Sequence, residues 1–327
     1  MIRTGTLGTG NIIRKHIRQL ADRDDAEIVA LCDVNPEALR VAKENHFEGK
    51  TINTYTDPAE MFSKENLDAV IIATPHTLHF GHTVQALEAG CHVFLEKPMT
   101  TSSKDAHRLA EKAEASGKVV AVGFNTSSKP VFQYLREQIR NKTFGGLELA
   151  TGFISQDWMV GMTGQWRQDP SLSGGGMAYD SGAHIFNSLL WCVESEPEMV
   201  FSFLDYKDRK VDINSVTSVR FANGVMANIT ISGNSAVVQK HMAFIFEGGV
   251  VEIDPWMASW MKVHVKGYPV EPEIDMPELF PITNFVDAIQ GKAEVAAGIE
   301  NGINHSLLMD GIYASAEKGH PVNPGEL

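Results

Sequence analysis

The alternation of strands and helices over the first 122 residues is the feature that most constrains the fold. Short apolar segments suited to strands alternate with segments whose apolar residues recur at helical spacing. The expected strands are 2–7, 27–32, 51–55, 68–73, 92–95 and 118–122, and the expected helices are 11–21, 36–45, 77–89 and 103–116. Parallel strands need a crossover between them, usually a helix. Residues 1–123 therefore predict an α/β domain with a doubly wound parallel sheet, of the class that binds nucleotides.

The pattern changes after Gly123, which we take as the boundary of a second domain, residues 124–327. Strands predominate there, expected at 147–155, 199–206, 214–221, 225–232, 241–247, 250–253 and 260–265. Asn223-Gly224 and Gly248-Gly249 lie between strand segments, as in hairpins. Helices are expected at 131–139, 174–191, 279–290 and 304–318. We expect an α+β domain with a large, mostly antiparallel sheet.

Composition excludes several classes of partner. The 327 residues carry a formal charge of −13, which argues against nucleic acid and anionic membrane surfaces, because both attract basic patches. No apolar run approaches the ~20 residues of a membrane span, and we expect no signal segment before the first strand. Cys32, Cys91 and Cys192 lie far apart in apolar stretches. They are expected to be buried free thiols of a cytoplasmic protein.

A glycine-containing turn follows the first expected strand. Gly8 and Gly10, with Asn11 and Ile12 opening the next helix, have the spacing of a turn whose backbone N–H groups approach a pyrophosphate. The third position of this motif is normally Gly or Ala, but here it is Ile13. The alternative is an ordinary turn between a strand and a helix.

Asp33 ends the second expected strand. An acidic residue at this place accepts hydrogen bonds from the adenosine ribose hydroxyls and repels a 2′-phosphate. Val34-Asn35 follows it, with no Ser-Arg pair. The sequence thus predicts NAD as the cofactor in preference to NADP, the alternative being that Asp33 only caps the helix beginning at Pro36.

Three residues have the chemistry for oxidising an alcohol. His184 has a reference pKa near neutrality and suits a general base, and Asp180, one helical turn earlier, can orient it or bind the substrate. Lys97 follows a strand at its carboxyl end, where ligands bind in open sheets, and can polarise the reacting oxygen. The alternative is an ordinary ion pair and a surface lysine, but the three residues together beside a glycine-rich turn favour a catalytic site.

Two other segments have competing interpretations. His76, His79 and His82 recur at every third residue, but no carboxylate or cysteine nearby completes a ligand set, so we expect no metal. Gln156 to Met159 precede a long loop, residues 161–173, which is either a substrate lid or a connector with oligomer contacts.

These motifs together resemble the Gfo/Idh/MocA family of sugar and polyol oxidoreductases over essentially the whole chain, most closely the inositol dehydrogenase type. The matching segments are Gly-x-Gly-x-Ile with His16, Ala-Thr-Pro…His79, Gly90…His92-Val93…Glu96-Lys97-Pro98, Val122-Gly123-Phe124, Trp166-Arg167, Gly174-Gly175-Gly176…Asp180…His184, and Ile312-Tyr313…Ser315-Ala316-Glu317…Gly319…Pro321-Val322. The chain departs from the pattern at His76, where many members have Asn. It also departs at 125–128, where Asn-Thr-Ser-Ser replaces an Arg-rich stretch.

The resemblance implies a Rossmann domain followed by a substrate-binding and oligomerisation domain with an open sheet. It implies that the nicotinamide ring lies between Lys97 and the helix of Asp180 and His184. The residues expected to bind the cofactor are Gly8, Gly10, Asn11, Ile12, Asp33, Thr74, His76, His79, Glu96, Lys97, Trp166 and Arg167, and those expected near the substrate are Asn125, Gln156, Trp158 and Arg167. Homodimers or homotetramers are expected.

The leading hypothesis is an NAD(P)-dependent dehydrogenase acting on a secondary hydroxyl of a sugar, inositol or related polyol. The alternative is a lyase or glycoside-cleaving enzyme that keeps NAD bound, oxidises its substrate transiently and eliminates. A third hypothesis, an NAD-binding regulator without activity, is disfavoured because Lys97, Asp180 and His184 are all present.

Overall fold

The chain folds into two compact units in a computed structural model that describes residues 1–49 and 51–327. Unit 1 comprises residues 1–100, 104–123 and 280–299, and unit 2 comprises residues 101–103, 124–279 and 300–327. One change from unit 1 to unit 2 along the chain lies between Gly123 and Phe124. Residues 280–299, which the sequence pattern assigned to the second domain, belong instead to unit 1.

Unit 1 contains a six-stranded parallel sheet with the strand order β3-β2-β1-β4-β5-β6. The strands are β1 (Ile2–Leu7), β2 (Ala26–Cys32), β3 (Asn53–Tyr55), β4 (Ala69–Ile72), β5 (His92–Leu95) and β6 (Val120–Val122). This is the order of the dinucleotide-binding fold, in which the direction of winding reverses between β1 and β4. The predicted doubly wound parallel sheet is confirmed.

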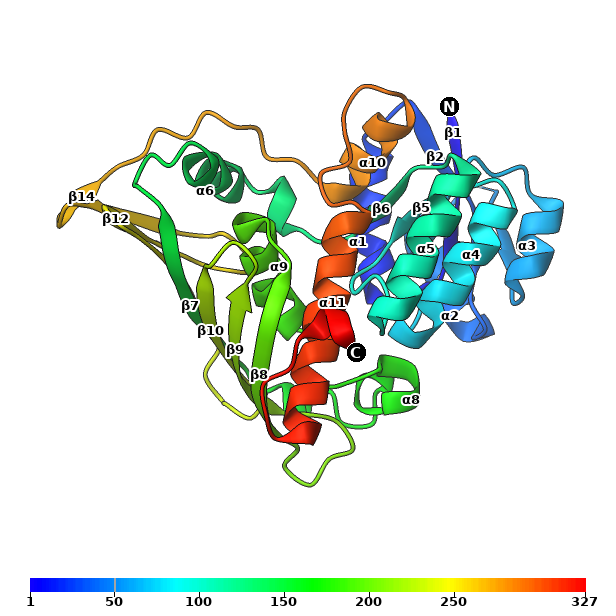
Figure 1. Cartoon of the computed structure of the whole chain (residues 1–327). Helices are drawn as coiled ribbons and strands as arrows, with labels where there is room; N and C mark the ends of the chain where they lie inside the picture. Colours follow the sequence, from blue (N-terminus) through cyan, green and yellow to red (C-terminus); the bar gives the residue numbers. More distant parts are fainter. Residues whose placement is uncertain (50) are drawn as a thin grey trace. The chain divides into compact units, whose positions relative to one another are not determined.

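Helices cover both faces of this sheet (Figure 1). They are α1 (Asn11–Ala21), α2 (Pro36–His46), α3 (Pro58–Lys64), α4 (His79–Glu88), α5 (Ser103–Ser116) and α10 (Pro281–Ile289). Buried residues of α1, α2 and α10 form one hydrophobic cluster with the strands. In α10, Ile282, Phe285 and Val286 are almost completely buried, which explains why this distant segment belongs to unit 1.

Unit 2 contains an eight-stranded sheet with the order β14-β13-β12-β11-β7-β10-β9-β8. The strands are β7 (Leu147–Ser155), β8 (Pro197–Asp205), β9 (Asn214–Phe221), β10 (Met226–Ser232), β11 (Gln239–Phe246), β12 (Gly249–Ile253), β13 (Met261–Val265) and β14 (Tyr268–Val270). All neighbours are antiparallel except β7 and β10, which run parallel. The predicted large, mostly antiparallel sheet is therefore confirmed.

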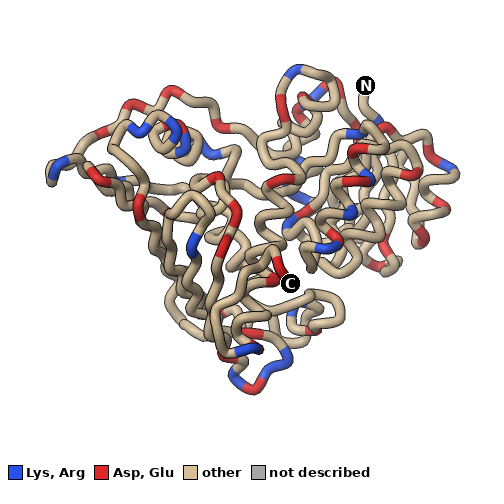
Figure 2. The backbone as a smooth tube through the Cα atoms, viewed as in Figure 1, with Lys and Arg blue, Asp and Glu red and all other residues tan. Residues whose placement is uncertain are grey.

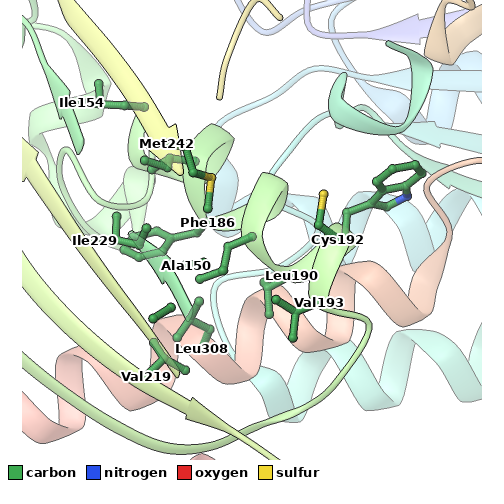
Figure 3. Close-up of a cluster of buried hydrophobic side chains, with 14 of the residues drawn as sticks. Ala150, Ile154, Phe186, Leu190, Cys192, Val193, Val219, Ile229, Met242 and Leu308 are labelled. Carbon is green, nitrogen blue, oxygen red and sulfur yellow. The ribbon is translucent and has the colours of Figure 1, made fainter. Parts of the chain in front are cut away.

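One face of the second sheet carries the core of unit 2. The helices of this unit are α6 (Pro130–Arg140), α7 (Trp158–Gly161), α8 (Pro170–Ser173), α9 (Gly182–Val193) and α11 (Ile299–Lys318). Figure 3 shows Phe186 and Leu190 of α9 and Leu308 of α11 packed with Ile229 and Met242 of the strands. The alternation of buried and exposed residues along β7 leaves the other face of the sheet open.

The helix expected over residues 174–191 begins only at Gly182. Gly174 has a positive φ of 76°, and the N–H groups of Gly176, Met177 and Ala178 all donate to Asp212 rather than joining a helix. Asp180 therefore lies in the turn before α9, and the expectation that it shares a helix face with His184 is wrong.

The distribution of charged residues and the burial of the cysteines agree with the expectations from composition. Figure 2 shows acidic and basic positions interspersed along both units. Cys32, Cys91 and Cys192 are free and buried, as expected. Among the described residues, no helix combines the length and the apolar character needed to cross a membrane.

Candidate active site

The turn between β1 and α1 has room for a phosphate group. Gly8 has a φ of 88°, and a Cβ there would lie 2.5 Å from the carbonyl oxygen of Ala73, so only glycine fits. A Cβ at Gly10 would meet no described atom within 4 Å, and no described side chain caps the N-terminus of α1. Asn11 and Ile12 are exposed in its first turn. Open amides at a helix N-terminus are the arrangement that binds a pyrophosphate.

Asp33 holds this turn against the end of β2. Its Oδ2 accepts hydrogen bonds from the Thr9 amide at 2.8 Å and the Thr9 hydroxyl at 3.0 Å. The helix cap is a different residue, Asn35, whose side chain accepts from the Glu37 amide at 3.0 Å. The other oxygen of Asp33, Oδ1, accepts a hydrogen bond from the Asn35 amide at 2.9 Å. A carboxylate has about four acceptor sites, so Asp33 retains capacity for about one further donor, such as a ribose hydroxyl.

His79 joins the ends of two strands of unit 1. Its Nδ1 lies 2.7 Å from the carbonyl oxygen of Pro98, after β5, and its Nε2 lies 2.9 Å from that of Thr74, after β4. Burial lowers the pKa of His79. His76 is also buried, with its ring 5.8 Å from that of His79. No cluster of metal-ligating side chains occurs in residues 1–49 and 51–327.

Glu96 is a carboxylate next to Lys97, and its side chain is 12% exposed. Its Oε1 lies 2.7 Å from Nε2 of His16 on α1, and its Oε2 accepts a hydrogen bond from the Lys97 amide at 3.3 Å. Burial acts to raise the pKa of Glu96, but the hydrogen bond from His16 and the charges of His16 and Lys97 lower it overall. The carboxylate thus stays ionised and fixes the backbone that carries Lys97.

In unit 2, Asp180 is held by two residues that the sequence placed in other roles. Its Oδ2 accepts a hydrogen bond from the Trp158 indole at 2.8 Å and forms an ion pair with Nε of Arg167 at 3.1 Å. The guanidinium of Arg167 also lies 4.6 Å from the ring centre of Trp166. Trp158, expected near the substrate, is only 2% exposed. These contacts orient the Asp180 carboxylate in the turn that precedes α9.

His184 contacts a different set of residues. Its Nδ1 lies 3.2 Å from Oδ1 of Asn125, and its ring stacks on Trp256 with centres 4.6 Å apart and planes 18° apart. The Gln156 side-chain amide donates a hydrogen bond to the hydroxyl of Ser181 at 2.6 Å. Ser181 lies between Asp180 and His184 in the chain. No local pattern in the sequence predicted the stacking of Trp256 on His184.

The turn that carries Asp180 is anchored by a residue that the sequence did not indicate. Asp212 is 1% exposed, and its carboxylate accepts from the amides of Gly176 at 2.7 Å and Ala178 at 2.9 Å. The Tyr313 hydroxyl of α11 also donates to it. Burial raises the pKa of Asp212, and these hydrogen bonds oppose the rise. A Cβ at Gly176 would lie 2.0 Å from the Asp212 carbonyl oxygen, which explains the glycine.

Comparison with known proteins identifies the family. Residues 2–124 match the model of the oxidoreductase family with an NAD-binding Rossmann fold, and residues 132–252 match the Gfo/Idh/MocA C-terminal domain. The chain belongs to the Gfo/Idh/MocA family. It is therefore an oxidoreductase with an NAD-binding domain, which confirms the predicted enzyme class and cofactor.

Named relatives cover most of the chain. The D-glucoside 3-dehydrogenase of Escherichia coli K12 is 25% identical over 98% of this chain and 97% of its own length. The myo-inositol 2-dehydrogenase of Thermotoga maritima is 28% identical over 70% of this chain and 67% of its own. The solved structure of an NAD-binding protein from Listeria innocua has a TM-score of 0.84 at 25% identity and covers 98% of this chain and 96% of its own.

Proposed function

We propose that this Gfo/Idh/MocA protein is a dehydrogenase that oxidises a secondary hydroxyl of a sugar, inositol or related polyol. The dehydrogenases named above act on substrates of this kind, and the chain has the acid–base groups for the reaction. The observation that carries the proposal is the set of contacts that fix Asp180 and His184, since each has its own hydrogen-bond partners in unit 2.

Each residue of the proposed site has a distinct role in this reaction. NAD supplies the acceptor for the hydride that leaves the carbinol carbon. His184 takes the hydroxyl proton, because a neutral imidazole is a suitable base near pH 7. The Lys97 ammonium stabilises negative charge on the oxygen that becomes a carbonyl. Asp180, fixed by Trp158 and Arg167, accepts a hydrogen bond from a substrate hydroxyl.

Unit 1 provides the cofactor contacts in this proposal. The amides after Gly10 bind the pyrophosphate, and Asp33 accepts hydrogen bonds from the adenosine ribose, which favours NAD over NADP. The other predicted cofactor residues of this unit are Thr74, His76, His79 and Glu96.

The test is net formation of NADH with a panel of sugars, inositols and other polyols. We expect at least one substrate to reduce free NAD in proportion to product, and His184→Asn and Lys97→Met to abolish most of that activity. Substrate conversion without accumulation of NADH would instead support the alternative, a lyase or glycoside-cleaving enzyme that oxidises transiently and returns the hydride.

We further infer that the protein is a cytoplasmic homodimer or homotetramer assembled through the open face of the second sheet. That face exposes large apolar side chains, including Phe203 at 66%, Met226 at 51% and Val216 at 44%. Exposed apolar patches of this kind mark interfaces. Light scattering on the wild type and on Phe203→Glu tests this: a monomeric wild type would refute the assembly.

A further inference from the structure

The orientation of the Asn125 amide is determined by the backbone of the loop between β12 and β13. Its Nδ2 lies 2.9 Å from the carbonyl oxygen of Trp256. A carbonyl oxygen only accepts hydrogen bonds, so the amide nitrogen must face it and the amide oxygen must point the other way. That oxygen, Oδ1, lies 3.2 Å from Nδ1 of His184.

The same reasoning fixes the proton on His184. Oδ1 of Asn125 is an acceptor, so Nδ1 of His184 must carry a hydrogen in order to donate to it. In a neutral imidazole one nitrogen is the donor and the other holds the lone pair. The lone pair of neutral His184 is thus on Nε2.

The groups around Asn125 and His184 are themselves held firmly. The Ser188 hydroxyl of α9 donates to the Pro255 carbonyl oxygen at 2.7 Å and lies 3.0 Å from the Thr126 hydroxyl. Asp254 accepts from the Trp256 amide at 3.0 Å. The Trp256 ring stacks on His184, so the imidazole has little freedom to rotate away from Asn125.

Several charged groups on elements near α9 occur in ion pairs within unit 2. These pairs are Asp180 with Arg167, Lys240 with Asp254, His241 with Glu252, Lys129 with Glu278, and Arg136 with Glu194. Asn125, in contrast, is uncharged. It therefore selects which nitrogen bears the proton without adding the charge that would hold His184 as imidazolium.

We infer that Asn125 is a positioning residue that holds neutral His184 in the Nδ1–H tautomer, so that Nε2 is the atom that takes the substrate proton. Asn125 was expected near the substrate, and this assignment gives it a role through His184 instead. The inference deepens the proposed function, because it rests on His184 being the base.

The first experiment reads the tautomer without requiring activity. In NMR spectra of protein with ¹⁵N-labelled histidine, recorded above the pKa of His184 and assigned with His184→Asn, the wild type should show a protonated Nδ1. In Asn125→Leu the proton should move toward Nε2, the nitrogen that carries it preferentially in free histidine. Protonation at Nε2 in the neutral wild type would overturn the inference.

The second experiment measures the pH dependence of kcat. Asn125→Asp keeps an acceptor but adds a negative charge near Nδ1, which favours imidazolium, so the acid limb should move up by about 1 unit or more. Activity should recover at high pH in this variant, whereas Asn125→Leu should be about tenfold or more slower at every pH. Asn141→Asp, an exposed position at the end of α6, is the matched control for added charge.

The outcomes separate the two levels of the proposal. A protonated Nδ1 together with full turnover in His184→Asn would support the tautomer assignment and refute His184 as the base. If folded Asn125→Asp has the same pH profile of kcat as the Asn141→Asp control, with an acid limb that has not moved, Asn125 does not act through His184.

Discussion

Removing one hydroxyl group, in Tyr313→Phe, should loosen the turn that carries Asp180. Tyr313 donates to the buried Asp212 carboxylate, and its ring stacks on Tyr179 with centres 5.4 Å apart. Phenylalanine preserves this stacking and introduces no new atoms. The change removes the hydrogen bond to Asp212, whose other donors are the amides of Gly176 and Ala178. It also removes a longer hydrogen bond, of 3.3 Å, that the Tyr313 hydroxyl accepts from the Gly176 amide.

The expected cost follows from the character of that hydrogen bond. Hydrogen bonds to charged groups contribute about 1.5–3 kcal/mol, and Asp212 is only 1% exposed, so water cannot replace the lost donor. We expect the free energy of unfolding of unit 2 to fall by about 2 kcal/mol, which is roughly a 30-fold change in its folding equilibrium.

Tryptophan fluorescence during urea unfolding measures this loss in unit 2 alone, because Trp158, Trp166, Trp191, Trp256 and Trp260 all lie there. The control is Tyr268→Phe, at a residue that is 75% exposed, which should stay within about 0.5 kcal/mol of the wild type. The indole N–H signal of Trp158, which donates to Asp180, reports on the turn directly. A stability equal to that of the control, or a lower stability with an unmoved Trp158 signal, would refute the reasoning.

Three further changes test unit 1. Asp33→Ala should reduce the preference for NAD over NADP by about tenfold or more, since it removes a like charge facing the 2′-phosphate. Calorimetric titration of both cofactors measures this preference. Tighter binding of NADP than of NAD by the wild type would contradict the prediction. Lys97→Met should lower turnover about 100-fold while NAD binding stays largely intact. If this variant turned over substrate as fast as the wild type, Lys97 would have no catalytic role. Glu96→Gln should destabilise the protein most at neutral pH, because the pKa of Glu96 is lowered in the folded state and its ionised form stabilises the fold above the ordinary glutamate pKa of 4.5. The difference in urea midpoint from the wild type should shrink as the pH falls below that value, and a constant difference would show that the charge is not responsible.

The fold was predictable wherever it depends on short-range patterns. The apolar strands of unit 1 alternate with amphipathic helices, and each signal lies within one segment of the chain. The short helix α3 was not predicted, although Asp57 caps it and Pro58 occupies its first turn. The start of α9 was misplaced because Asp212, 36 residues after Gly176, takes the amides that a helix would have used.

The residue types of the candidate site were also predictable, but their pairings were not. Asp180 and His184 were expected to interact on one helix face. The structure shows Asp180 in contact with Trp158 and Arg167, and His184 in contact with Asn125 and Trp256. Trp158 and Arg167 come from the segment between β7 and α9, Asn125 follows β6, and Trp256 lies between β12 and β13. A single sequence does not show which of these segments lie side by side.

The two units thus fix their functional groups by different physical means. In unit 1 the phosphate-binding turn depends on backbone conformation at Gly8 and on the open amides after Gly10, which a short motif specifies. In unit 2 the proposed acid–base groups, Asp180 and His184, are contacted by the side chains of Trp158 in α7 and Asn125 after β6. Under this proposal, substitutions at Trp158 and Asn125 can change the orientation of Asp180 or the tautomer of His184 while leaving the folding of the nucleotide-binding unit intact. Substrate choice and pH dependence are therefore properties that this architecture can alter independently of cofactor binding.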